Sequence, residues 1–359
     1  MKTSNKEKYL GDILHTNGKV KHTIEDRKNR AIAISAEILG IINDIPLGKY
    51  KIEIGLKLRQ AMLLNGVLFN SEAWHAVKQA DIKTLETIDE YLLRALVKGH
   101  SKTPLEFLYL EAGALPIRFL ISSRRMIYFQ TILKRDENEL TKKILKFQMN
   151  NPTVGDFIEL IKNDFTMIGE KININEIEQT SVRSYKKFIK EKIRKAALKY
   201  LNEMKDQHSK IHHIKYEKLE TQKYVTSEMF SDEEVNLLFA LRSRTVDCKG
   251  NFKSKYKDMN IICQYCKTHE DHQPHMLNCE MTKKRLKSTE MIKEKFEYED
   301  LFKDVHKQRI ITQVFKEIIE VRQKLKDETE PGTPDLCTIP VLVNSTDIHS
   351  RIDVYLSRK

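Results

Sequence analysis

Four metal-ligating side chains cluster in a short stretch near the C-terminal end of the sequence. Two residues separate Cys263 from Cys266, and three separate His275 from Cys279. The eight residues between the two pairs are enough to reverse the chain, so the pairs can face one another. Zinc takes four sulfur or nitrogen ligands in a tetrahedron, and a set with no open position is typical of structural sites. The spacing therefore predicts a structural Cys₃His Zn²⁺ site.

The same stretch leaves two alternatives open. His269 and His272 also lie in the loop, and either could replace His275 as the fourth ligand. We favour His275 because its short separation from Cys279 suits a tight second turn. The other alternative is that the cysteines are free thiols in a reduced protein. The sequence has five cysteines, and an odd number fits a reducing compartment better than a disulfide framework.

The composition predicts a globular protein that is mainly α-helical. The 359 residues are 40% hydrophobic and include only 12 glycines and 8 prolines, which favours long helices over a turn-rich β fold. No apolar run opens the chain, and no run reaches the roughly 18 apolar residues that a membrane span needs. We therefore expect no membrane partner and an intracellular location, cytoplasmic, nuclear or both.

Hydrophobic periodicity and cap residues set the order of the expected elements. A strand over Lys8–Leu14 precedes Asn17-Gly18, a strong signal for a hairpin turn. Thr23 and Asp81 are expected to cap helices, and Pro104 and Pro116 to mark helix starts. Helical patterns cover, approximately, residues 23–45, 50–67, 81–96, 117–133, 181–204, 232–242 and 304–325, and a further helix is expected to start at Pro104.

The helix after Pro116 is rich in large apolar residues and is expected at the centre of a bundle. Its three arginines, Arg118, Arg124 and Arg125, are expected to face outward.

The helix over Ser181–Met204 is strongly basic. The whole chain carries a formal net charge of +12, which predicts attraction to polyanions. Cations on such a helix can neutralise phosphates, giving binding that weakens steeply as salt rises. Tyr185, Phe188 and Tyr200 could stack on single-stranded bases, although Tyr185 is expected in the core. The alternative is that the lysines simply form a solvated surface.

Catalytic motifs are missing from the sequence. It has no glycine-rich phosphate loop, no Gly-x-Ser-x-Gly and no Asp-Asp pair, whereas polymerase chemistry needs clustered aspartates to hold two divalent ions. Asp335, Asp347 and Asp353 could be imagined as a nuclease set, but no lysine lies at suitable spacing. We expect no enzyme activity from this chain on its own.

Several segments resemble the C-terminal part of non-LTR (LINE-type) retrotransposon reverse transcriptases. Lys8–Gly11, with the helix that begins at Thr23–Arg27, is similar to the primer-grip hairpin and first thumb helix of that family. Leu63–Trp74 and Leu108–Ile117 resemble its thumb and connection, and the Cys₃His set resembles its CCHC zinc knuckle. The likeness covers roughly residues 8 to 325, and the zinc spacing is its most specific part.

The resemblance implies roles for particular residues. Tyr9, Leu10 and Gly11 would lie near the primer terminus. The family's fingers and palm, with their Tyr/Phe-x-Asp-Asp catalytic strand, are expected before Tyr9. Cations of the first helix and of the basic helix would contact the RNA or DNA backbone: Arg27, Lys28, Arg183, Lys186, Lys187, Lys190, Arg194 and Lys195.

The resemblance therefore implies the template-primer-binding or element-RNA-binding part of an RNA-directed DNA polymerase, completed by a separate palm or another element protein. Alternatives are a domesticated zinc-containing protein-interaction module and a nuclease that uses the tail. The expected divisions are a primer-grip-like hairpin, a thumb-like bundle, a basic helical connection, a zinc knuckle, a C-terminal helix and a tail, at residues 1–22, 23–150, 151–245, 246–290, 291–328 and 329–359.

Overall fold

A computed structural model describes residues 5–9, 12–16, 20–45, 50–74, 77–246, 248–252, 260–286 and 297–329. These residues are mainly helical, with a short N-terminal hairpin, which confirms the expected fold class. The elements up to residue 205 are β1 (Lys6–Tyr9), β2 (Asp12–His15), α1 (Lys21–Asp44), α2 (Lys51–Leu58), η1 (Arg59–Leu64), α3 (Asn65–Val67), η2 (Ser71–Ala73), α4 (Gln79–Leu96), α5 (Leu105–Ala112), α6 (Ile117–Leu133), α7 (Leu140–Asn150), α8 (Phe157–Met167), α9 (Ile174–Gln179) and α10 (Val182–Lys205).

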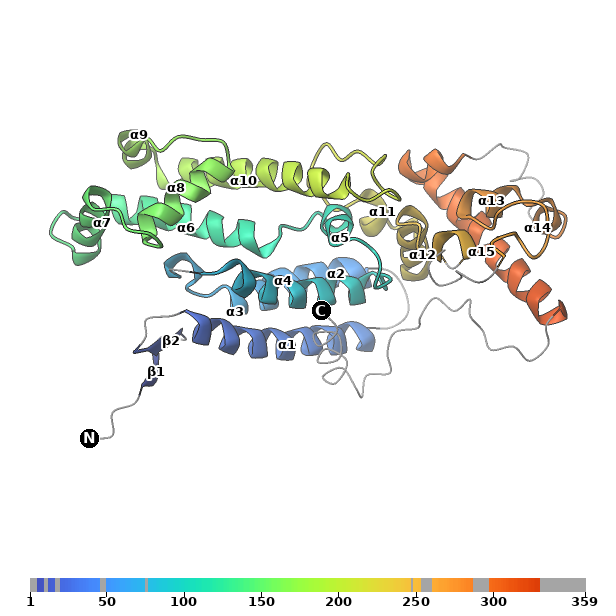
Figure 1. Ribbon diagram of the computed structural model, residues 1–359, viewed down its shortest axis with the longest axis horizontal. Coiled ribbons are helices and arrows are strands. Elements are labelled where there is room, and N and C mark those ends of the chain that lie inside the picture. Colours follow the sequence, from blue (N-terminus) through green and yellow to red (C-terminus); the bar gives the residue numbers. More distant parts are fainter. Residues whose placement is uncertain are drawn as a thin grey trace.

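The remaining elements form a group at one end of the long axis (Figure 1). They are α11 (Lys223–Thr226), α12 (Asp232–Arg242), η3 (Lys249–Phe252), α13 (Gln273–Asn278), α14 (Glu280–Lys283), η5 (Tyr298–Phe302) and α15 (Val305–Thr329). The segment from α2 through η1 to α3 is continuous and matches the helix expected over residues 50–67, with a π-helical turn, η1, at its middle.

Four long helices are stacked in successive layers. Helix α1 packs on α4, α4 packs on α6, and α6 packs on α10. The two middle helices are apolar on two sides, because each must cover a neighbour above and below. On α4, Leu85, Ile88 and Leu92 face the cluster that includes α1, whereas Leu93 belongs to the larger cluster with α5 and α10. Helix α6 is therefore central, as its composition predicts.

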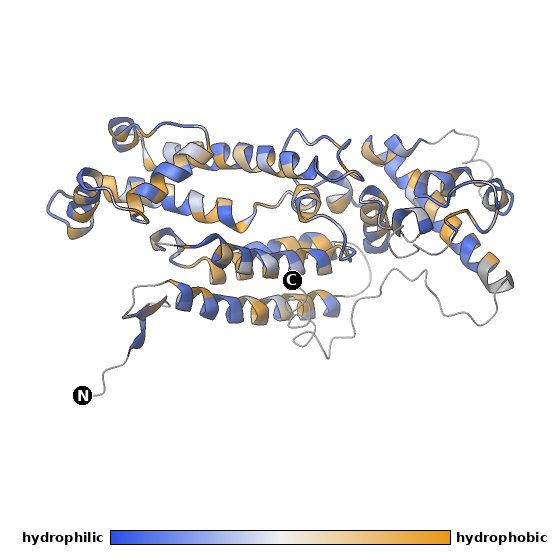
Figure 2. Cartoon of the chain, in the orientation of Figure 1, coloured by the Kyte–Doolittle hydropathy of each residue, from blue (hydrophilic) through white to orange (hydrophobic). Residues whose placement is uncertain are grey.

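The basic helix α10 has an apolar face that is buried in the core, whereas Val182 in its first turn is exposed. Tyr185, Ile189, Ile193, Ala197 and Leu201 recur every four residues, and all are buried in the larger core cluster. The helix begins where expected, because the Ser181 hydroxyl accepts a hydrogen bond from the Ser184 backbone N–H at 3.1 Å. Figure 2 shows hydrophobic and hydrophilic residues alternating from turn to turn along this helix.

The N-terminal hairpin differs from the sequence expectation. Its strands pair Tyr9 with Asp12, so the single strand expected over Lys8–Leu14 is instead divided between two paired strands, and the turn expected at Asn17-Gly18 lies outside the described residues. Thr23 does not cap α1, which begins two residues earlier. Its hydroxyl instead accepts a hydrogen bond from the Ile13 N–H at 3.0 Å and fixes β2 to the helix. The hairpin is mostly hydrophilic (Figure 2).

Two other expectations about polar residues are wrong. Asp81 lies in the first turn of α4 and accepts a hydrogen bond from the Lys78 N–H, so it is not the cap residue. The arginines of α6 do not face outward: Arg125 is buried and paired with Asp164, while Arg118 forms a bidentate pair with Glu86. Arg124 donates to the Leu68 carbonyl. These cations link α6 to its neighbours.

A buried ion pair joins the helical stack to the C-terminal group. Glu111 on α5 and Arg242 on α12 are 1% and 2% exposed, and two hydrogen bonds of 2.9 and 2.8 Å connect them. The hydroxyls of Tyr216 and Tyr224 donate to the same carboxylate, Tyr224 at 2.6 Å. The Arg242 guanidinium also donates to the Leu301 carbonyl at 2.7 Å. Both charges are thereby compensated, as burial demands.

Replacing Arg242 with Met should destabilise the protein strongly. The substitution leaves the Glu111 carboxylate buried without its cation, which typically costs about 3–5 kcal/mol. Urea unfolding followed by circular dichroism measures the loss. Glu233→Gln is the control, because this glutamate is 71% exposed and lies 3.9 Å from Lys316, a pair worth about 0–1 kcal/mol. A loss for Arg242→Met no larger than that of the control would contradict the assigned role.

Candidate metal centre and basic surface

The first half of the candidate metal centre is a tight turn. The Lys267 N–H donates to the Cys263 carbonyl at 2.9 Å, and the Cys263 N–H donates to the His269 carbonyl at 2.7 Å. Lys267 adopts a left-handed conformation with φ of 55°, which lets the chain reverse just after Cys266. Antiparallel pairing of Ile262 with Glu270 closes the base of the turn. Both thiols therefore lie on the inner side of one loop.

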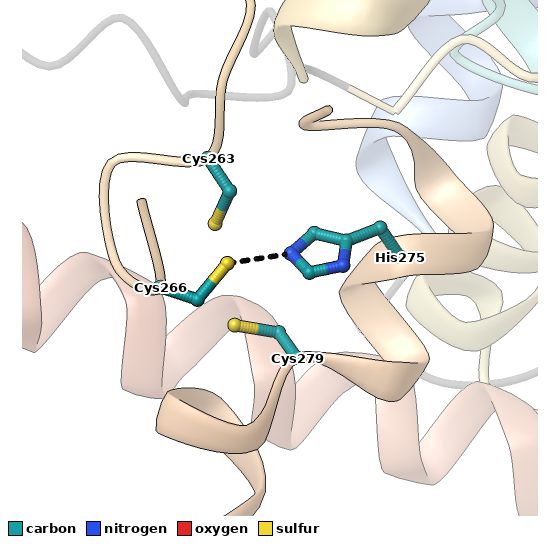
Figure 3. Close-up of side chains that lie close together, drawn as sticks. All are labelled: Cys263, Cys266, His275 and Cys279. Atoms are coloured by element: carbon teal, nitrogen blue, oxygen red, sulfur yellow. Dashed lines mark hydrogen bonds between the residues drawn. The ribbon is translucent and has the colours of Figure 1, made fainter. Parts of the chain in front are cut away.

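The second half is the short helix α13. Its first turn is capped by His272, whose Nδ1 accepts a hydrogen bond from the His275 N–H at 3.0 Å. His275 and Cys279 are four residues apart, so the helical turn places both on the side that faces the cysteine loop. Figure 3 shows the four side chains pointing toward one another.

The four ligand atoms lie close enough together to hold a metal ion. One atom from each of Cys263, Cys266, His275 and Cys279 lies within 4.8 Å of all the others. The Cys266 Sγ and His275 Nε2 atoms are 3.3 Å apart, the contact drawn as a dashed line in Figure 3. A tetrahedron with metal–sulfur bonds of about 2.3 Å has edges of about 3.8 Å. The set can therefore hold a metal ion after only small side-chain movements.

Burial and hydrogen bonding together give the thiols of Cys263 and Cys266 different pKa values. Cys263 is fully buried, and burial raises the pKa of its thiol to about 11. Burial acts in the same direction at Cys266, but hydrogen bonds from Thr268 and His269 outweigh it and lower the pKa of that thiol to about 5. Burial lowers the pKa of His275, which favours the neutral imidazole that binds metals. A bound cation would stabilise all the thiolates together.

The structure brings together the four ligands that the sequence predicts. The two alternative histidines lie close by but have other roles: His269 stacks on His275 with ring centroids 5.2 Å apart, and His272 caps α13. Sequence reasoning missed Arg322 on α15, whose guanidinium lies 3.7 Å from the Cys263 sulfur. No local pattern could have found it, because 59 residues separate the two.

The basic residues of α10 form one exposed row. Arg183, Lys186, Lys187, Lys190 and Arg194 follow spacings of three and four residues and are all exposed, so they share a face of the helix. The first four make no hydrogen bond or ion pair with any described residue, whereas Arg194 donates to the Leu219 carbonyl.

Lysines elsewhere on α10 are paired. Lys195 contacts Glu191, Lys192 contacts Glu170, and Lys199 lies 3.9 Å from Glu203. The exposed row near the start of α10 lies toward the opposite end of the long axis from the metal centre (Figure 1). The basic row and the metal centre therefore do not form one continuous surface.

The N-terminal candidates have mixed outcomes. Tyr9 is 63% exposed on β1, while Leu10 and Gly11 lie outside the described residues. Arg27 is buried, with its guanidinium 3.0 Å from the Asp12 carboxylate, so it fixes the hairpin to α1 and is not free to contact nucleic acid. Lys28 is half-buried. We leave Arg27 out of the proposed interface.

Comparison with known proteins identifies no relative. No protein-family model, no curated protein and no solved structure matches this chain. Within the described ranges, none of the helices combines the length and the apolar character that crossing a membrane requires.

Removing two ligands should abolish metal binding. Wild-type protein is expected to carry about one zinc ion per chain, and Cys263→Ser/Cys266→Ser should carry almost none, since the site loses half of its ligands. Elemental analysis of the purified proteins measures this. Cys248→Ser is the matched control, because Cys248 is a buried cysteine outside the cluster, and the zinc content of this variant should not change. Equal zinc in the double variant and the wild type would refute the site.

Proposed function

We propose that this protein binds nucleic acid through the exposed cations of α10 and uses a structural Zn²⁺ ion to hold its C-terminal group together. Zinc is the ion that a closed set of three thiolates and one imidazole suits best. All four positions of a tetrahedron are filled by protein atoms, which leaves none for a catalytic water. The centre therefore serves folding.

The observation that carries nucleic-acid binding is the unpaired row on α10. Lysines on a helix usually gain an acidic partner or scatter over the surface, as Lys195 and Lys199 do. Arg183, Lys186, Lys187 and Lys190 instead lie together, and none of them forms a salt bridge with a carboxylate among the described residues, although the charge of Glu191 interacts with that of Lys187. The row from residue 183 to residue 194 extends about 16 Å along the helix, enough to follow several phosphates.

We further propose that the chain is the thumb and zinc-knuckle region of a retroelement RNA-directed DNA polymerase. The supporting features are the similar segments Lys8–Gly11, Leu63–Trp74 and Leu108–Ile117, the order of hairpin, helical stack and Cys₃His cluster, and the lack of an Asp-Asp pair. RNA or DNA in a template-primer duplex would be held by its backbone. A separate palm would supply the catalytic aspartates.

A second candidate function is protein interaction. Leu140, Ile144 and Phe147 on α7 recur at spacings of four and three residues and are 71%, 48% and 65% exposed. An apolar row of this kind on a helix is typical of a protein-binding surface. The nuclease alternative relies on Asp335, Asp347 and Asp353, which lie outside the described residues.

Neutralising the row should weaken nucleic-acid binding and flatten its salt dependence. We expect Arg183→Ala/Lys186→Ala/Lys187→Ala/Lys190→Ala to reduce the slope of log affinity against log salt by about 3 to 4, because each lost phosphate contact removes about 0.9 for duplex. Fluorescence anisotropy with single-stranded and duplex oligonucleotides, between about 50 and 200 mM KCl, measures the slope.

The control removes the same formal charge from paired positions. Its substitutions to Ala are at Lys21, Lys57, Lys146 and Lys199, each an exposed lysine paired with a glutamate. This variant should keep a slope close to that of the wild type. An unchanged slope in the α10 variant would refute the interface, and wild-type protein that binds no oligonucleotide would favour the protein-interaction function.

A further inference from the structure

Arg322 of α15 contacts the metal-binding loop at three points. Its Nη1 donates to the Asp271 carboxylate at 2.8 Å, and its Nη2 donates to the Cys263 sulfur at 3.7 Å. The guanidinium also lies 5.0 Å from the centre of the Tyr265 ring, and the Tyr265 hydroxyl donates back to the Arg322 carbonyl at 3.0 Å. The arginine is only 7% exposed. One side chain thus holds both ends of the loop to the last helix.

Asp271 fixes the direction of this guanidinium. The Asp271 carboxylate accepts a hydrogen bond from the Lys249 backbone N–H at 3.3 Å. The backbone N–H of Asp271 donates to the Ile261 carbonyl at 2.8 Å. Because one amino group of the Arg322 guanidinium donates to Asp271, the other points toward the Cys263 sulfur. Hydrogen-bond partners of this kind orient the ligands of metal sites.

Helix α15 is also the surface on which the C-terminal group is assembled. It packs against α12, η5, α13 and α14, and Ile311, Val314, Phe315 and Ile318 are buried in the core cluster. Both halves of the metal centre, the loop that ends near Asp271 and the helix α13, therefore rest on the same helix. Ordering of the loop and docking of α15 involve the same contacts.

We propose that Arg322 is a positioning residue of the metal centre and couples metal binding to the docking of α15. This inference rests on the proposed metal site. It adds that metal binding and the docking of α15 each favour the other. Metal binding fixes the loop that receives Arg322, and docked Arg322 holds the Cys263 sulfur in position for the metal. By linkage, whatever metal binding adds to the docking of α15, docking adds to metal affinity.

The first test compares metal affinities. Arg322→Met keeps much of the side-chain length but removes the charge and the donors, and it should weaken zinc binding by about 10- to 100-fold in competition with a chelator. Arg322→Lys keeps the charge without the planar fork and should recover part of that loss. Arg309→Met is the control, because Arg309 is exposed on the same helix, and its zinc affinity should be unchanged.

The second test separates coupling from a general loss of structure. In the wild type, amide hydrogen exchange across residues 316–326 should slow when metal is added, and in Arg322→Lys this slowing should be smaller. Cobalt-loaded Arg322→Lys should keep its thiolate-to-cobalt absorption band, since the four ligands remain.

Three results decide the matter. The coupling would be overturned if both Arg322 variants bound zinc as tightly as the wild type does. It would also be overturned if metal left the amide hydrogen exchange of α15 in the wild type unchanged. If Arg322→Met does not fold, the lysine variant and the wild-type exchange experiment still decide. Wild-type protein that binds no metal would instead overturn the metal site itself.

Discussion

The arrangement of this molecule depends on the buried ion pair between Glu111 and Arg242. It joins α5 of the helical stack to α12, and through the Leu301 carbonyl to η5, which lies next to α15. Helix α15 in turn carries both halves of the metal centre. Because an unpaired charge in this position would be very costly, the pair fixes where the C-terminal group is attached. The two tyrosine hydroxyls on the same carboxylate complete its hydrogen bonds.

Much of the fold could be predicted from the sequence, because its signals are local. The buried face of α10 repeats every four residues, and Pro104 and Pro116 immediately precede α5 and α6, where a missing N–H costs nothing. The four metal ligands could also be predicted, since two short spacings place each pair on one turn. Helix α15 begins within one residue of the expected start at Asp304, whose side chain accepts a hydrogen bond from the Lys307 N–H.

The features that could not be predicted are long-range pairs of charges. Arginines are expected at the surface by default, yet Arg27, Arg125 and Arg242 are all buried beside carboxylates. Their partners are 15, 39 and 131 residues away, and no periodicity encodes such a match. The hairpin register failed for a related reason. A short polar ribbon has no apolar face to fix its pairing, so the sequence did not show that Lys8–Leu14 is divided between two paired strands.

The metal centre and the basic row of α10 have separate tasks in this account. We propose that the first organises the C-terminal group around α15 and that the second provides phosphate contacts on the helical stack. The existence of the metal centre is the central claim, and X-ray absorption at the zinc edge of purified protein tests it most directly. We expect a shell of three sulfur atoms at about 2.3 Å and one nitrogen at about 2.0–2.1 Å. A protein without bound zinc, or zinc surrounded only by oxygen and nitrogen, would contradict the account.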